Sequence, residues 1–262
     1  DSVRKNILGN IDWECEVKVL FQEKNLGCGQ GVYTAINWLF KEEEVGIILE
    51  DDCIAQKSFF PYVETLLEKY KFDTRIGMIR GMNVLKESES KNSYIFSRYK
   101  SCWGRATWRR SWENMDLNMK WRGTLEAENI LKNMGYKGRD VKYWKYRLKL
   151  IDAKDVSAWD WQWYFSLAAQ NQLSIFPTKS LISNIGFTEE STHTASKPKN
   201  SYSTTEELDF PMRHPEYIIP SYEFDKAYYK ENENFIRKII RYFPIWMKNK
   251  IKKILRGWKW EK

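Results

Sequence analysis

Alternating apolar and polar residues predict a strand–helix–strand order in the first third of the chain. Residues 16–22 alternate as a half-buried strand does. Apolar residues at helical spacing predict helices at 31–43 and 58–70. Short apolar runs predict strands at 47–49 and 75–80. Strands that alternate with helices in this way are typical of a parallel sheet covered by helices.

The rest of the chain follows a less regular pattern. The range 102–112 contains four aromatic or apolar positions among Arg and Thr, and it is expected to lead into a helix. Residues 188–222 are rich in Ser, Thr, Lys and Pro and are expected to form a loop. The remaining expected elements are helices at 3–10, 124–134, 138–151 and 158–169 and strands at 93–97 and 173–176.

Three carboxylates end the apolar strand at 47–49. Glu50, Asp51 and Asp52 follow it without a break, and ligands bind outside the carboxyl ends of strands in open α/β sheets. Crowded carboxylates repel one another and need a counter-charge, which a hard divalent cation completed by substrate phosphates supplies. An isolated acidic triplet usually marks a solvated turn, but its position after a buried strand favours a metal-dependent enzyme acting on a phosphorylated donor.

Two further signals allow more than one interpretation. Gly27, Gly29 and Gly31 precede a helix and either bind phosphate through backbone N–H groups or form a tight turn. Asp160 lies between Trp159 and Trp161. Flanking rings desolvate a carboxyl, which raises its pKa and suits a general base, although a helix N-cap is the alternative.

Composition restricts the chemistry. The four Cys residues form no C-x-x-C pair, which disfavours zinc and fits a reducing compartment, and only two His residues exist. The net charge is +8, but residues 235–262 alone carry +9, so the rest of the chain is close to neutral. This distribution argues against a nucleic-acid partner.

The basic segment 235–262 is amphipathic on both sides of Pro244. Apolar residues share one helical face in each half, and Lys and Arg fill the other. The apolar positions are Phe235, Ile236, Ile239, Ile240 and Phe243 before Pro244, and Met247, Ile251, Ile254 and Trp258 after it. This pattern favours a pair of helices lying on an anionic membrane surface, and docking on the protein body is the alternative.

Several motifs together resemble a nucleotide-sugar glycosyltransferase with the GT-A fold. The similarity is to a bacterial group related to glycosyltransferase family 2 and to the Golgi N-acetylglucosaminyltransferases. It spans roughly residues 15 to 195. The motifs are Asn25-Leu26-Gly27-Cys28-Gly29, Ile47-Ile48-Leu49-Glu50-Asp51-Asp52, Ser58-Phe59-Phe60, Trp103-Gly104-x-Ala106-Thr107-Trp108, Trp159-Asp160-x-x-Trp163, and Asn184-Ile185-Gly186 followed by Thr192-His193-Thr194.

The resemblance implies a role for each matched residue. Asp160 is the expected catalytic base of an inverting transfer, and Asp52 with His193 is expected to hold Mn²⁺ or Mg²⁺ at the donor diphosphate. The expected substrate-binding residues are Glu50, Asp51, Asn25, Gly27, Gly29, Trp103, Gly104 and Trp161.

The resemblance also implies the architecture. We expect an α/β fold with a GT-A-like, mostly parallel sheet in residues 1–200, a loop or linker at 201–234, and the amphipathic tail at 235–262. The first N-terminal strands of the family, with their nucleotide-base contacts, have no counterpart here. We therefore expect an exposed sheet edge and weak turnover by this chain.

The leading hypothesis is transfer of a sugar from a nucleotide-diphosphate donor to a saccharide or lipid-linked acceptor in surface-polysaccharide synthesis. The expected location is the cytoplasm, peripheral to the inner membrane face. A metal-dependent nucleotidyltransferase or phosphotransferase would use the same strand-end carboxylates. A non-enzymatic basic binding protein would need positive charge across its body, which the charge distribution disfavours.

Overall fold

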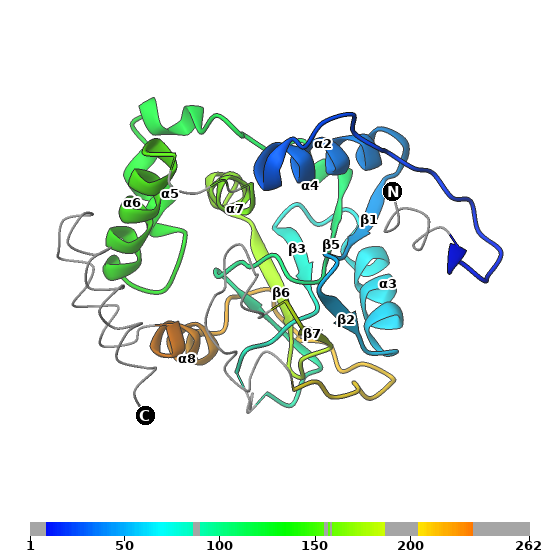
Figure 1. Cartoon of the computed structure of the whole chain (residues 1–262). Coiled ribbons are helices and arrows are strands. Elements are labelled where there is room, and N and C mark those ends of the chain that lie inside the picture. The colour runs from blue at the N-terminus through cyan, green and yellow to red at the C-terminus, as the bar shows by residue number, and fades with distance from the viewer. Residues whose placement is uncertain (1–8, 86–89, 155–156, 158, 187–203, 233–262) are drawn as a thin grey trace, which may run out of the picture.

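A computed structural model describes residues 9–85, 90–154, 157, 159–186 and 204–232. These residues form a mixed α/β fold with seven α-helices and a five-stranded sheet (Figure 1). The helices are α2 (Gly27–Glu42), α3 (Phe59–Lys69), α4 (Arg109–Trp112), α5 (Ala127–Lys132), α6 (Gly138–Asp152), α7 (Asp160–Ala169) and α8 (Tyr222–Asn232), with a 3-10 helix η1 (Lys120–Gly123). The strands are β1 (Val45–Ile48), β2 (Cys53–Ala55), β3 (Ile76–Arg80), β4 (Tyr94–Ser97), β5 (Arg105–Trp108), β6 (Leu173–Pro177) and β7 (Ile182–Asn184).

The main sheet is mixed, so the expected mostly parallel sheet is wrong. Its strand order is β1-β5-β3-β6-β4, and only β3 and β6 pair in parallel. The other three pairs, β1·β5, β3·β5 and β4·β6, are antiparallel. The expectation failed because β5 forms in the stretch that was expected to lead into a helix. Its insertion separates β1 from β3, the two strands that the strand–helix–strand pattern would have made neighbours.

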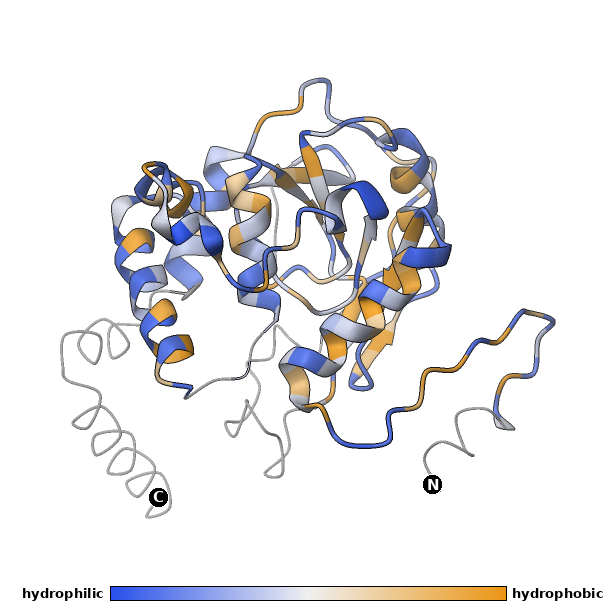
Figure 2. Ribbon diagram, turned by 90° about the horizontal axis from the view of Figure 1, so that it is seen from above, coloured by the Kyte–Doolittle hydropathy of each residue, from blue (hydrophilic) through white to orange (hydrophobic). Residues whose placement is uncertain are grey.

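Two clusters of apolar side chains cover the two faces of the sheet. On one face, α3 contributes Phe59, Val63 and Leu66, which pack against Ile76 and Ile79 of β3. Figure 2 shows how the apolar positions of the helices gather toward the strands. Burying these side chains supplies most of the free energy that holds α3 on the sheet.

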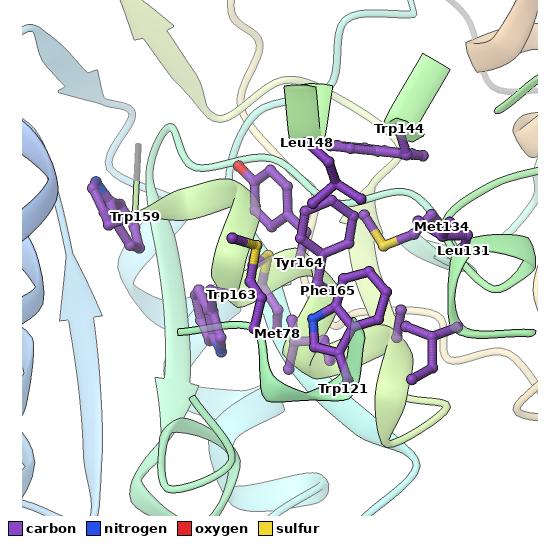
Figure 3. Close-up of a cluster of buried hydrophobic side chains, with 14 of the residues drawn as sticks. Met78, Trp121, Leu131, Met134, Trp144, Leu148, Trp159, Trp163, Tyr164 and Phe165 are labelled. Atoms are coloured by element: carbon purple, nitrogen blue, oxygen red, sulfur yellow. The ribbon is translucent and has the colours of Figure 1, made fainter. Parts of the chain in front are cut away.

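The other face is packed by α7, by Ile130 and Leu131 of α5 and by Trp144 of α6. Figure 3 shows Trp163, Tyr164 and Phe165 of α7 in this cluster with Met78 of β3 and Trp121. Ring contacts such as the one between Trp121 and Phe165, whose centroids are 5.1 Å apart, account for much of the tryptophan content as core packing.

Most expected elements have counterparts within the described residues. The expected helices at 31–43, 58–70, 138–151 and 158–169 correspond to α2, α3, α6 and α7. The expected strands at 47–49, 75–80, 93–97 and 173–176 correspond to β1, β3, β4 and β6. The small antiparallel sheet of β2 and β7 was not expected, since three-residue strands are too short for a periodicity to identify.

The strand expected at 16–22 is absent from the structure. These residues form neither helix nor strand and run away from the body (Figures 1 and 2). Four apolar side chains in this segment are exposed: Val17, Val19, Leu20 and Phe21. Apolar and polar residues do alternate in this segment, but within the described residues no strand forms hydrogen-bonded pairs with it.

The range 201–234 was expected as a loop or linker. Residues 204–232 instead lie against the body and include α8, whose Phe224 is buried with its ring centroid 4.9 Å from that of Phe176 in β6. Asp225 is also buried and accepts a hydrogen bond from the Ser97 hydroxyl. The segment 235–262 lies outside the described residues, as does most of the expected helix at 3–10.

Candidate functional site

The carboxylate triplet lies in the turn between β1 and β2. The backbone N–H of Cys53 donates to the carbonyl of Glu50 over 3.0 Å, which closes the turn. The side chain of Asp51 is exposed, while those of Glu50 and Asp52 are partly buried. β1 is followed by the three acids at its carboxyl end, as the sequence predicts.

Asp52 is held against the segment that follows β7. Its carbonyl accepts a hydrogen bond from the Ile185 N–H over 2.9 Å. A Cβ built on Gly186 would lie 2.1 Å from Oδ2 of Asp52, so only glycine leaves room for this carboxylate. The Asn184-Ile185-Gly186 motif therefore positions Asp52 directly.

Glu50 faces a buried arginine that the sequence prediction missed. Nη1 of Arg105, on β5, lies 3.8 Å from Oε1 of Glu50, and the Arg105 side chain is fully buried. Burial raises the pKa of Glu50; Arg105 opposes this effect, and the neighbouring acids Asp52, Asp160 and Asp51 add to it. Arg105 supplies the counter-charge for which the sequence prediction invoked a divalent cation.

Asp160 begins α7 next to the same arginine. The Arg105 guanidinium lies over the Trp159 ring, 4.1 Å from its centroid. Burial raises the pKa of Asp160, whereas a hydrogen bond with Tyr164 and the charge of Arg105 lower it. The expected desolvated carboxyl is therefore present. Trp159 holds the N-cap position of α7 and Asp160 is the first helical residue, so the alternative in which Asp160 is the N-cap differs from the structure.

The N-terminus of α2 reaches the same region. The Gly29 N–H donates to Oγ of Ser157 over 3.0 Å, and Ser157 is three residues before Asp160. Burial and then the charges of Glu50 and Asp160 raise the pKa of the Cys28 thiol. The glycine motif, the triplet and Asp160 thus lie near one another, although Asp160 follows the other two by more than 100 residues along the chain.

The glycines resemble a turn more than a phosphate cradle. The Gly27 N–H donates to Oδ1 of Asn25 over 2.7 Å, an arrangement in which the asparagine side chain stabilises the turn. Because the Gly27 and Gly29 N–H groups both have acceptors, neither is free for a phosphate in this structure. The helix begins at Gly27 rather than after Gly31.

Two further residues complete the cluster. Cys102 is partly buried, and desolvation followed by the charges of Asp160 and Glu50 raises the pKa of its thiol well above the ordinary value. Tyr164 lies one helical turn after Asp160, and burial likewise raises its pKa. Spacing of four residues on a helix could have identified Tyr164 as a neighbour of Asp160, but no sequence signal pointed to Cys102 or Arg105.

Other expected residues have roles outside the carboxylate cluster. Trp161 stacks under Arg147 of α6, with 4.3 Å from the guanidinium carbon to the ring centroid. Trp103 packs against the apolar cluster on the α3 face. Gly104 adopts a positive φ of 56°, and its carbonyl accepts a hydrogen bond from the Gly81 N–H. His193 lies outside the described residues.

The expected Mn²⁺ or Mg²⁺ would need oxygen ligands at this site. No group of three or more His, Cys, Asp or Glu side chains in the described part of the chain could hold a metal ion. Mg²⁺ in substrate-dependent sites often takes one or two carboxylates and obtains its other ligands from phosphates and water. Asp52, with its oxygen held near Gly186, fits that smaller donor set.

Comparison with known proteins gives no match. No protein-family model matches the chain. No curated protein matches it either. Among the described residues, every helix is too short or too polar to cross a membrane.

Proposed function

We propose that the chain is an inverting glycosyltransferase that moves a sugar from a nucleotide-diphosphate donor to a saccharide or lipid-linked acceptor. One observation carries the proposal: Glu50 and Asp160 lie near the same buried arginine, Arg105, and the N-terminus of α2 lies near both acids. Acidic side chains without a common role would not be expected to lie near the same buried guanidinium. The proposed pathway is surface-polysaccharide synthesis at the inner face of a membrane.

Each group has a proposed task. Asp160 accepts the proton of the acceptor hydroxyl, for which a pKa raised by burial is suitable. Tyr164 and Arg105 stabilise the ionised carboxylate of Asp160. Asp52, together with His193, binds Mn²⁺ or Mg²⁺, which neutralises charge on the leaving diphosphate when bound. Glu50 and Asp51 contact the ribose or the donor sugar.

The first test measures binding and transfer separately. Wild-type protein is titrated by calorimetry with a panel of sugar nucleotides in the presence and absence of Mn²⁺. Asp52→Asn is expected to lose the Mn²⁺-dependent part of binding. Asp160→Asn is expected to retain donor binding and to lose transfer to acceptor by a factor of about 10² or more, the typical contribution of a general base.

Asp209→Asn is the matched control, because this aspartate is exposed and forms only a surface ion pair with Lys179 at 3.4 Å. It is expected to behave as wild type. Donor binding that ignores both Mn²⁺ and Asp52 would contradict the proposal. Formation of a phosphoester product from the same donors would favour the nucleotidyltransferase or phosphotransferase alternative, which uses the same carboxylates.

A further inference from the structure

Two arginines lie side by side inside the sheet face that α7 covers. Arg80 ends β3 and Arg105 begins β5, and the two residues are register partners in the antiparallel pair. Both side chains are fully buried. Arg80 lies over Phe176, 4.7 Å from its ring centroid, and Arg105 lies over Trp159. Two adjacent cations are therefore enclosed mainly by aromatic rings.

Most of their hydrogen-bond donors have no acceptor within the described part of the chain. Nε, Nη1 and Nη2 of Arg80 are all buried without a partner, and so are Nε and Nη2 of Arg105. Nη1 of Arg105 donates to the carbonyl of Cys102. Its separation of 3.8 Å from Glu50 is an ion pair beyond hydrogen-bond length.

Arg110 shows that this fold can give a stacked arginine a hydrogen-bond acceptor at each of its three side-chain nitrogens. Its guanidinium lies over Trp108, 4.4 Å from the ring centroid. Its Nε, Nη1 and Nη2 donate to the carbonyls of Lys71, Ile76 and Tyr70 over 2.8, 3.0 and 2.8 Å. Most side-chain N–H groups of Arg80 and Arg105 therefore lack acceptors within the described residues because of where these two residues lie, and not because arginines in this fold generally lack them.

Buried arginines with open donors are costly unless an acceptor completes them. A phosphoryl or carboxylate oxyanion fits this need, because its oxygens pair with the planar fork of a guanidinium and neutralise its charge. We propose that Arg80 and Arg105 together bind an oxyanion of the substrate. Glu50, whose side chain is 30% exposed, lies between Arg105 and solvent and is displaced when the anion enters.

The position of the arginines assigns the oxyanion to the acceptor. Arg105 contacts the residues around Asp160, whereas Asp52 is turned toward Gly186 and β7. This assignment rests on the proposed function, in which Asp160 faces the acceptor hydroxyl and Asp52 the donor diphosphate. The acceptor class is then an anionic saccharide, either phosphorylated or carrying a carboxylate.

The test uses inorganic phosphate as the probe, with the full chain followed by thermal shift and calorimetry. Arg80→Met is expected to weaken phosphate binding by about tenfold or more, the loss of a charge-assisted hydrogen bond. It should leave the melting temperature of the unliganded protein unchanged or higher, since it removes an unpaired buried cation. Arg110→Met should do the reverse: lower the melting temperature and leave phosphate binding intact.

A second variant keeps the test informative if Arg80→Met does not fold. Glu50→Gln removes the carboxylate that competes for Arg105, so phosphate should bind more tightly than to wild type. Equal phosphate binding by wild type, Arg80→Met and Glu50→Gln would overturn the proposal. So would phosphate binding that is absent from wild type and from Glu50→Gln.

The source of the oxyanion is decided by competition. Glucose 6-phosphate and glucuronate are compared with uncharged glucose, and only the charged sugars should displace phosphate. Displacement by a nucleoside diphosphate with Mn²⁺ would overturn the assignment to the acceptor and move the arginines to the donor site. Phosphate binding is measured without any sugar transfer. A variant that loses phosphate binding therefore tests the arginine site, and a wild-type protein that fails to transfer sugar tests the proposed function.

Discussion

At the scale of single residues, Arg105 determines the electrostatics of the site. The triplet alone suggested that its acids need a divalent cation, but the fold provides a guanidinium 3.8 Å from Glu50. The same charge lowers the pKa of Asp160 against the opposing effect of burial. One buried cation thus acts on both a candidate substrate-binding acid and the candidate base, and for neither residue could this cation be predicted from its sequence neighbours.

Asp160 should destabilise the fold when it is ionised. Because its pKa in the folded state is raised, wild type loses stability as the pH rises from about 3.9, the ordinary value, through the folded pKa. Asp160→Asn lacks this loss and should melt at a higher temperature than wild type at pH 8. The difference should vanish below about pH 4. Thermal melting across pH measures it.

Asp152→Asn is the control with the opposite sign. A hydrogen bond from Arg122 lowers the pKa of Asp152, so this variant should be slightly less stable than wild type at neutral pH. That difference should disappear as the pH falls through the lowered pKa, and it should be small because the pair is exposed to solvent. A lower melting temperature for Asp160→Asn at pH 8 would show that its carboxylate stabilises the fold.

At the scale of elements, short strands carry the site. β5 inserts Arg105 between β1 and β3, and the β2–β7 pair brings Gly186 against Asp52. These strands have three or four residues, so their pairing depends on a few close contacts. The approach of β7 to the start of β5 is one of these close contacts, because Ile182 lies over Gly104.

Gly104→Ala should therefore destabilise the protein. The residue has a φ of 56°, and a Cβ there would lie 2.4 Å from Cγ1 of Ile182. Strained backbone and overpacking together should lower the free energy of unfolding by about 1–3 kcal/mol in urea denaturation. Gly123→Ala is the control, since nothing lies within 4 Å of its Cβ position. Equal stability of both variants would contradict this account of the β5–β7 contact.

At the scale of the whole molecule, β1 forms an open edge of the sheet. It pairs with β5 on one side, and within the described residues no strand pairs with the other side. Val45, Ile47 and Leu49 are about 40% exposed. This agrees with the exposed edge expected from the sequence, and an open edge with apolar side chains promotes association between copies.

Ile47→Lys should reduce that association without affecting the fold. The side chain is 38% exposed on the edge strand, so the free energy of unfolding should change by about 0.5 kcal/mol or less. Light scattering at rising protein concentration should show less self-association than wild type. Ile48→Lys is the control: its side chain packs against the apolar cluster on the α7 face, and the variant should be clearly destabilised. Unchanged scattering for Ile47→Lys would mean that the edge does not mediate contact.

The sequence by itself determined the long helices, the apolar strands and the position of the acids. Helical spacing over a dozen residues marks α2, α3 and α6 because one face of each must be buried, and the triplet follows β1 because the apolar run ends there. Asp160 was also identified as a desolvated carboxyl, since the flanking tryptophans are local features.

Only the tertiary structure decided how these pieces meet. Strand order depends on which edges pair across the sheet, and the four residues of β5 run directly into α4, so the stretch was expected to lead into a helix and the mixed sheet was not predicted. For the same reason the partners of Glu50 and Asp160 were hidden: Arg105 reaches both because β5 lies beside β1 and under α7. The spacing of apolar residues within a segment determines which of its side chains are buried. The pairing of strands that are distant in the sequence determines which charged side chains lie in the same site.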